Sequence, residues 1–163
     1  MLSVTRIFRH AGLAVALAAA LAVSACANKP ADDSLASAGA ATPGSQQDFV
    51  VNVGDRVFFE VDSSELTAQA RATLDKQAQW LTNYRTYAFT VEGHADERGT
   101  REYNIALGAR RAQSVRDYLA ARGVEASRMR TVSYGKERPV AVCNDISCWS
   151  QNRRSVTVLG VTS

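Results

Sequence analysis

From residue 57 onward, apolar side chains recur with the spacing of strands in some segments and of helices in others. Four short segments are rich in β-branched and aromatic residues, or alternate between apolar and polar positions, as strands do. They cover residues 57–61, 87–93, 129–134 and 154–161. We therefore predict four strands, with long segments between the first three.

The two segments between the first three strands show helical spacing. The first follows Thr67, whose hydroxyl can cap a helix, and runs to about residue 84. Its apolar stripe consists of Ala70, Leu74, Ala78 and Leu81. The second covers residues 101–122 and ends before Gly123, a residue type common just after a helix. With a turn in the loop 136–152, the order β-α-β-α-β-(turn)-β indicates a helix-on-sheet sandwich with crossover connections.

The second predicted helix carries two polar residues on its apolar face. Asn104 and Arg111 fall inside the apolar stripe of the helical wheel, not opposite it. A charge on a buried face needs a partner, because an unpaired buried ion is very costly. Arg111 therefore extends to the surface, pairs with an internal carboxylate, or binds a ligand. The stripe consists of Leu107, Ala112, Val115, Tyr118 and Leu119.

Asp96 lies in the polar loop 94–100, which joins the second strand to this helix. We expect Asp96 to lie near the first turns of the helix, and so near Arg111. A carboxylate and a guanidinium half-buried at such a junction suit a zwitterionic ligand, because one binds an ammonium and the other a carboxylate. The alternative is an ion pair between Asp96 and Arg111.

The N-terminal residues 1–25 differ from the rest of the chain. Eighteen of them are apolar and none is acidic, and Arg6 and Arg9 precede an apolar run at 11–23. This pattern is typical of a secretory signal, and the run is shorter than the ~20 residues that a membrane-spanning helix needs. A transmembrane anchor is the alternative. Val23-Ser24-Ala25-Cys26 resembles the lipobox of bacterial lipoproteins, in which the cysteine is lipidated and becomes the first residue.

A lipidated Cys26 would anchor the chain to a membrane, since two or more acyl chains bind a bilayer stably. The next residue is Ala27, and the absence of an aspartate there indicates the periplasmic face of the outer membrane. Residues 26–47 are rich in Ala, Ser, Gly, Pro and Asp, which predicts a flexible tether. The chain thus divides into a signal at 1–25, this lipidated tether, and a domain at 48–163.

Two cysteines remain if Cys26 is lipidated. Export places Cys143 and Cys148 in an oxidising compartment. Their spacing fits neither a C-x-x-C redox motif nor half of a zinc site. We predict a local disulfide between them, and two free buried thiols are the alternative.

The formal net charge of +3 belongs mostly to the signal. Without Arg6 and Arg9, 17 Lys and Arg stand against 16 Asp and Glu, a net charge of +1. The basic doublets Arg110-Arg111 and Arg153-Arg154 are not interleaved with aromatic residues. Nucleic acid is therefore not predicted as a partner.

Several longer motifs occur in an order that resembles the OmpA C-terminal-like domain family and, given the lipobox and tether, its lipoprotein members. The resemblance covers residues 56–160. It implies an α+β fold, a two-layer sandwich with helices on one face of a mixed four-stranded sheet. The motifs are Val57-Phe58-Phe59, GHADERGT at 93–100, EYNIALGARRA at 102–112, VSYGKE at 132–137 and Asn152-Arg153-Arg154.

The resemblance implies non-covalent binding of meso-diaminopimelate in the stem peptide of peptidoglycan, which offers the ammonium and carboxylates argued above. The ligand-binding Asp and Arg of such domains correspond to Asp96 and Arg111. The family motif N-x-x-L-x-x-x-R-A-x-x-V is matched by Asn104, Leu107, Arg111, Ala112 and Val115. Looser correspondences are Asp62, His94, Arg98, Asn152 and Arg153. The pair Cys143 and Cys148 is an addition to the family pattern.

The resemblance also implies a role in joining the outer membrane to the cell wall, within the Tol envelope and cell-division system. The periplasmic TolB protein is the second partner it implies. An enzyme is not predicted: one histidine, His94, remains after the signal, so no metal or cofactor is expected, and no G-x-S-x-G motif occurs. Glu92, Asp96 and Glu97 could imitate the carboxylates of a glycosidase, so a peptidoglycan hydrolase is the enzymatic alternative.

Overall fold

The computed structural model describes residues 41–160. The predicted signal, Cys26 and most of the predicted tether lie outside these residues. One compact unit of the chain begins at Ala41, before the predicted domain boundary at residue 48. None of the helices within 41–160 is long and apolar enough to cross a membrane.

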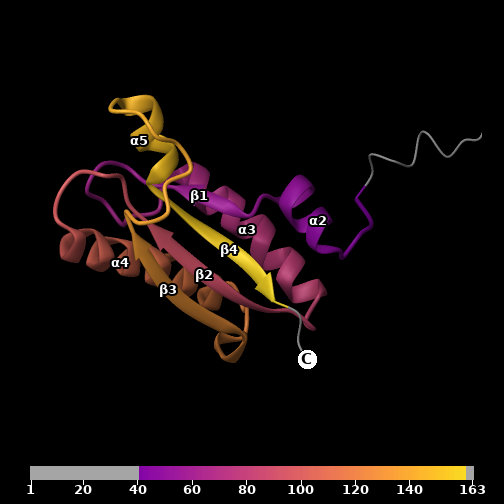
Figure 1. Cartoon of the computed structure of the whole chain (residues 1–163). Coiled ribbons are helices and arrows are strands. Elements are labelled where there is room, and N and C mark those ends of the chain that lie inside the picture. The colour runs from indigo at the N-terminus through magenta and orange to yellow at the C-terminus, as the bar shows by residue number, and fades with distance from the viewer. Residues whose placement is uncertain (1–40, 161–163) are drawn as a thin grey trace, which may run out of the picture. The chain divides into compact units, whose positions relative to one another are not determined.

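Four strands form one mixed sheet in the order β1-β4-β2-β3. The inner strand β4 (Arg154–Gly160) runs antiparallel to both β1 (Arg56–Phe58) and the other inner strand, β2 (Ala88–His94). The edge strand β3 (Met129–Gly135) runs parallel to β2. The sheet is visible in Figure 1 with β4 in yellow crossing its centre. The predicted α+β sandwich with a mixed four-stranded sheet is confirmed.

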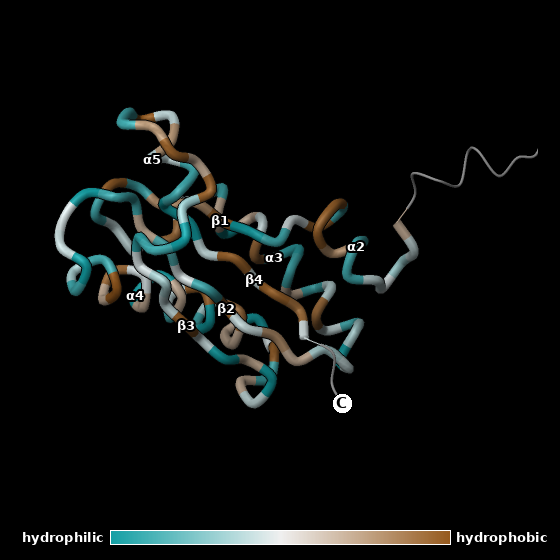
Figure 2. The backbone as a smooth tube through the Cα atoms, viewed as in Figure 1, coloured by the Kyte–Doolittle hydropathy of each residue, from teal (hydrophilic) through white to brown (hydrophobic). Residues whose placement is uncertain are grey.

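The two long helices pack on one face of the sheet (Figure 1). Helix α3 (Ala68–Asn83) packs on β1, and α4 (Arg101–Ala121) packs on β2 and β3. Both predicted apolar stripes pack there, with Tyr118 half-buried and the other members buried. Figure 2 shows hydrophobic positions along β4, of which Leu159 is in the core and Val158 is exposed. The core between the layers includes Val57, Leu74, Leu81, Val91, Ala112, Val115, Leu119 and Leu159.

Capping residues set the ends of both long helices. Thr67, as predicted, accepts a hydrogen bond from the backbone N–H of Ala70 at 3.1 Å. Thr100 caps α4 in the same way through the N–H of Tyr103. At the other end of α4, Gly123 has φ 88°, the left-handed conformation that a glycine adopts without a steric penalty.

Two glycines bring β2 and α4 into close contact. A Cβ on Gly93 would overlap the backbone carbonyl of Gly108, and a Cβ on Gly108 would lie 2.8 Å from the carbonyl oxygen of Gly93. The Ser133 hydroxyl donates to the carbonyl of Ile105 at 2.7 Å and ties β3 to the same helix. The end of β2 is therefore held against the first half of α4. Asp96 follows this end of β2, and Arg111 lies on α4.

Two short helical turns precede the sheet: α2 (Gln46–Asp48) and the π-turn η3 (Phe49–Val53). Buried Asp48 accepts hydrogen bonds from the Trp80 indole at 2.8 Å and from the backbone N–H of Gly44 at 2.9 Å. Gln46 donates to the carbonyl of Leu159 at the end of β4. These contacts place residues 41–47 in the domain, where the sequence had predicted tether.

The segment between β3 and β4 contains a short helix, α5 (Ile146–Asn152), in the loop where the sequence predicted a turn. Asp145 caps this helix by accepting from the N–H of Ser147 at 2.7 Å. A disulfide joins Cys143 to Cys148. Asn152 accepts from the N–H groups of Val140 and Ala141, which fastens the loop to the end of α5. The 3-10 turn η4 (Ala126–Arg128) lies before β3.

Candidate functional site

A pocket of about 290 Å³ lies beside the connection from β2 to α4. Figure 2 shows that this connection is mostly hydrophilic. Six of the nine residues predicted for peptidoglycan binding line the pocket. They are Asp62, Asp96, Arg98, Asn104, Leu107 and Arg111. Val61, Gly99 and Tyr103 complete the lining.

Arg111 is fully buried at the pocket and donates to backbone carbonyls. Its guanidinium binds the carbonyl oxygens of Ser63 at 2.8 Å, His94 at 2.8 Å and Glu60 at 3.0 Å. Burial, followed by the nearby Arg153 cation, lowers the pKa of Arg111 to about 10, so the group stays charged at neutral pH. Arg111 therefore joins two backbone segments at the pocket, residues 60–63 and the end of β2.

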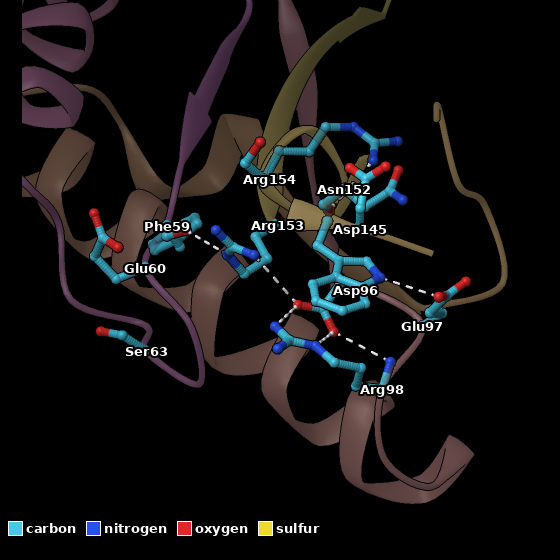
Figure 3. A network of polar contacts seen from close by, with 12 residues as sticks. Phe59, Glu60, Ser63, Asp96, Glu97, Arg98, Asp145, Asn152, Arg153 and Arg154 are labelled. Carbon is cyan, nitrogen blue, oxygen red and sulfur yellow. Dashed lines mark hydrogen bonds and ion pairs between the residues drawn. The ribbon is translucent and has the colours of Figure 1, made fainter. Parts of the chain in front are cut away.

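Asp96 binds two other arginines, not Arg111. Arg98 approaches it with its Nε at 3.1 Å and an Nη at 2.6 Å, and Arg153 lies 3.4 Å away (Figure 3). The backbone N–H of Arg98 also donates to Asp96. Burial raises the pKa of Asp96, but the hydrogen bonds from Arg98 outweigh this and hold the pKa below its ordinary value. The expected alternative, an ion pair between Asp96 and Arg111, is not the arrangement found.

The pocket lining includes Tyr103, a residue that the sequence analysis did not single out. The Tyr103 hydroxyl donates to the carboxylate of Asp62, and both side chains are exposed. Asp62 has φ 56°, a conformation that is uncommon outside glycine and recurs at functional sites. The signal for Tyr103 was its position next to Asn104, at the start of the helix that carries the site.

Asn104 and Leu107 shape the pocket from α4. The Asn104 amide donates to the carbonyl of Arg98 at 2.7 Å and so fixes the loop that carries Asp96. Leu107 is buried one turn further along the helix and supplies an apolar surface. The polar residue that the helical wheel placed on the apolar face therefore has a definite partner.

Three of the predicted binding residues do not line this pocket. Gly93 faces α4, and the next residue, His94, does not line the pocket. The His94 ring packs against the Tyr134 ring, with centroids 5.6 Å apart. His94 reaches the site only through its carbonyl, which binds Arg111. Asn152 donates to the carbonyl of Ala141 in the loop before α5, and Arg153 forms an ion pair with Asp96 at 3.4 Å.

The pocket combines cations and carboxylates on a small, partly apolar surface. Arg98 and Arg111 provide N–H groups, and Asp62 and Asp96 provide carboxylates. Such a set can bind a molecule that carries both an ammonium and carboxylates. Within residues 41–160, no three His, Cys, Asp or Glu side chains gather as a metal site would require.

Comparison with known proteins gives the family. Residues 58–153 match the model of the OmpA family. The chain belongs to the OmpA family, among its peptidoglycan-associated lipoproteins. This confirms the resemblance drawn from the sequence motifs.

The similar lipoproteins cover most of this OmpA-family chain. The "Peptidoglycan-associated lipoprotein" of Agrobacterium fabrum is 66% identical over 152 residues, which is 90% of this chain and 86% of that protein. The protein of the same name from Pseudomonas aeruginosa is 52% identical over 97 residues, 60% of this chain and 57% of that protein.

Solved structures show the same fold. The peptidoglycan-associated lipoprotein of Burkholderia pseudomallei superposes with a TM-score of 0.63 at 42% identity, over 65% of this chain and 90% of that one. The C-terminal domain of Helicobacter pylori MotB superposes with a TM-score of 0.62 at 21% identity, over 67% of this chain and 86% of that one. At that identity the second comparison shows the fold alone.

Proposed function

We propose that this OmpA-family chain binds peptidoglycan non-covalently through the pocket between Asp62, Asp96 and Arg111. The observation that carries the proposal is that six predicted ligand residues, spread over residues 62–111, line a single pocket. The names of the similar lipoproteins support peptidoglycan as the ligand class.

The ligand group we propose is the meso-diaminopimelate of the stem peptide. The end of its side chain carries an ammonium and a carboxylate on one carbon. Asp96 suits the ammonium because its carboxylate is ionised. Its Oδ2 accepts one short hydrogen bond, from Arg98 at 2.6 Å, while its contact to Arg153 is 3.4 Å, longer than the 2.7–2.9 Å typical of a strong charged hydrogen bond. Arg98 and Arg111 suit the carboxylate, since each has N–H groups beyond those already bonded within the protein.

We propose that the chain uses this pocket to hold the outer membrane to the cell wall. Lipid on Cys26 would anchor the chain at the periplasmic face, and the segment between Cys26 and the domain would span the gap to the wall. The Tol-Pal envelope and cell-division system, with TolB as a protein partner, is the setting that the family resemblance supports. A fixed, non-enzymatic link needs affinity and no turnover.

The alternative function is a peptidoglycan hydrolase, which would use carboxylates such as Asp96 for catalysis. The arrangement favours binding, because Asp96 already accepts three hydrogen bonds from Arg98 and one from Arg153, which keeps it ionised. A general acid needs a raised pKa, and the pKa of Asp96 is lowered.

Co-sedimentation with isolated peptidoglycan sacculi tests the proposal. The wild-type chain should pellet with sacculi, while Asp96→Ala and Arg111→Ala should stay in the supernatant. Circular dichroism must show both variants folded under the conditions used. Arg122→Gln, on the exposed end of α4, is the matched control and should pellet as the wild type does. Retained binding in both pocket variants would refute the site, and soluble muropeptide fragments would indicate a hydrolase instead.

A further inference from the structure

The disulfide and the helix α5, which contains Cys148, lie beside the loop that carries Asp96 and do not line the pocket. Cys148 is bonded to Cys143, and the next residue, Trp149, contacts the loop that carries Asp96. The Trp149 indole donates to the Glu97 carboxylate at 3.0 Å. The Arg98 guanidinium lies over the same indole ring, 4.2 Å from its centroid. Trp149 therefore contacts both residues that follow Asp96.

We propose that Trp149, held by the Cys143–Cys148 disulfide, is a positioning residue that fixes Arg98 at the mouth of the pocket. The proposal rests on the proposed function, because Arg98 lines the pocket taken to bind peptidoglycan. Trp149 itself does not line the pocket, but it contacts Arg98, which does. Its effect on a ligand passes through Arg98.

Arg98 needs such a support because its side chain is 40% exposed. A free arginine side chain at the surface samples many rotamers, and fixing it costs conformational entropy. Here one edge of the guanidinium is bonded to Asp96 and one face lies on the indole. The N–H groups on the remaining edge are thereby directed outward, ready for a ligand carboxylate.

The disulfide matters because α5 has only seven residues. A helix of that length is not stable by itself in water. The disulfide ties its first turn to the preceding loop, and Asn152 ties its last turn to Val140 and Ala141. With both ends fastened, the Trp149 ring stays in place against Arg98.

The test is calorimetric titration of the full chain, purified in detergent, with the soluble stem tripeptide L-Ala-γ-D-Glu-meso-diaminopimelate. Trp149→Ala should weaken binding about three- to fivefold, the size of an exposed cation–π contact. Trp149→Phe keeps an aromatic face, so it should lose less than about twofold. The paired substitution Cys143→Ser with Cys148→Ser should weaken binding as Trp149→Ala does, with no further loss when all three are combined.

A second background separates positioning from general structural damage. In an Arg98→Ala chain, Trp149→Ala should have no further effect, because the group that it positions is gone. Arg122→Gln breaks a similar contact, Arg122 over Tyr118 at 4.8 Å, far from the pocket, and should leave the affinity unchanged. Wild-type affinity in Trp149→Ala, or an equal loss with and without Arg98, would overturn the proposal.

Failure of the proposed function is distinguishable from failure of this inference. If the wild-type chain does not bind the stem tripeptide, the proposed function fails. The contact between Arg98 and Trp149 is then measured in the absence of ligand, from the NMR chemical shift of the Arg98 Nε–H. Ring current should displace this signal upfield in the wild type, and Trp149→Ala and the paired serine variant should both restore its ordinary position. An undisplaced wild-type signal would overturn the inference.

Discussion

Arg111 binds the carbonyl of His94, two residues before Asp96, at 2.8 Å, yet it does not pair with the Asp96 carboxylate. The two side chains line one pocket, and each has its own partners. Arg111 fixes the backbone that carries Asp96, while Arg98 and Arg153 fix the carboxylate itself. The pocket thus keeps opposite charges apart, with space for a ligand of both signs.

Loss of the Arg111 guanidinium should destabilise the fold as well as the site. Arg111→Met keeps the apolar stem but leaves the carbonyls of Glu60, Ser63 and His94 without their donor. Each buried group left unsatisfied costs about 1–3 kcal/mol. We expect the free energy of unfolding to fall by about 3–5 kcal/mol, measured by urea denaturation.

Arg98→Gln is the comparison that separates binding from folding. Arg98 is partly exposed, and exposed ion pairs contribute about 1 kcal/mol or less. This variant should therefore lose peptidoglycan affinity with little loss of stability. Equal destabilisation by the two substitutions would contradict the structural role given to Arg111.

His94 should make the fold sensitive to acid. Its ring is 2% exposed, and burial, followed by the Arg154 and Arg138 cations, lowers its pKa from 6.5 to about 4. The unfolded chain then binds a proton between these values and the folded chain does not. Stability is therefore complete above pH 6.5 and is lost as the pH falls toward 4, by about 3 kcal/mol from this group.

A His94→Gln variant measures that contribution. Other carboxylates titrate in the same range, so the quantity to compare is the difference between the two chains in unfolding free energy at pH 7 and pH 4. The wild type should lose about 3 kcal/mol more than the variant over this range. Identical pH profiles would show that the buried ring does not resist protonation.

The contact between β2 and α4 should not tolerate a methyl group. Gly93→Ala would force a Cβ into the Gly108 carbonyl, and backbone on both sides leaves little room for relaxation. We expect a loss of about 3 kcal/mol in unfolding free energy, at the upper end of ordinary overpacking. Gly123→Ala is the control, because its Cβ meets no atom within 4 Å and costs only about 1–2 kcal/mol from the left-handed backbone. Equal losses would mean that the close contact is not what matters at Gly93.

Local patterns predicted the elements closely. The Thr67 cap and the apolar stripe from Ala70 to Leu81 gave α3, and Gly123 gave the end of α4. The order of strands in the sheet depends on long-range pairing, which periodicity does not encode. The turns before β1 were missed because Asp48 is a core residue only through Trp80, 32 residues away.

Part of the site was missed for the same reason, since its contacts join residues that are far apart in the sequence. The wheel placed Arg111 on the buried face, but its partners are carbonyls, which have no sequence signature. His94 was included as a binding residue because it stands in a recognisable motif. Strand alternation after Gly93 would have directed its ring to the other face of the sheet. Trp149 was missed because α5 lies 52 residues from Glu97 and is positioned by the disulfide.

The most direct measurement compares two soluble stem tripeptides that differ in one group. Calorimetric titration of the wild-type chain with the meso-diaminopimelate tripeptide and with its lysine counterpart changes only the side-chain carboxylate. Loss of a charge-assisted hydrogen bond of about 1.5–3 kcal/mol corresponds to at least about a tenfold change in affinity. The account predicts that the lysine peptide binds at least about tenfold more weakly. Equal affinity for the two peptides would contradict a pocket that recognises ammonium and carboxylate together.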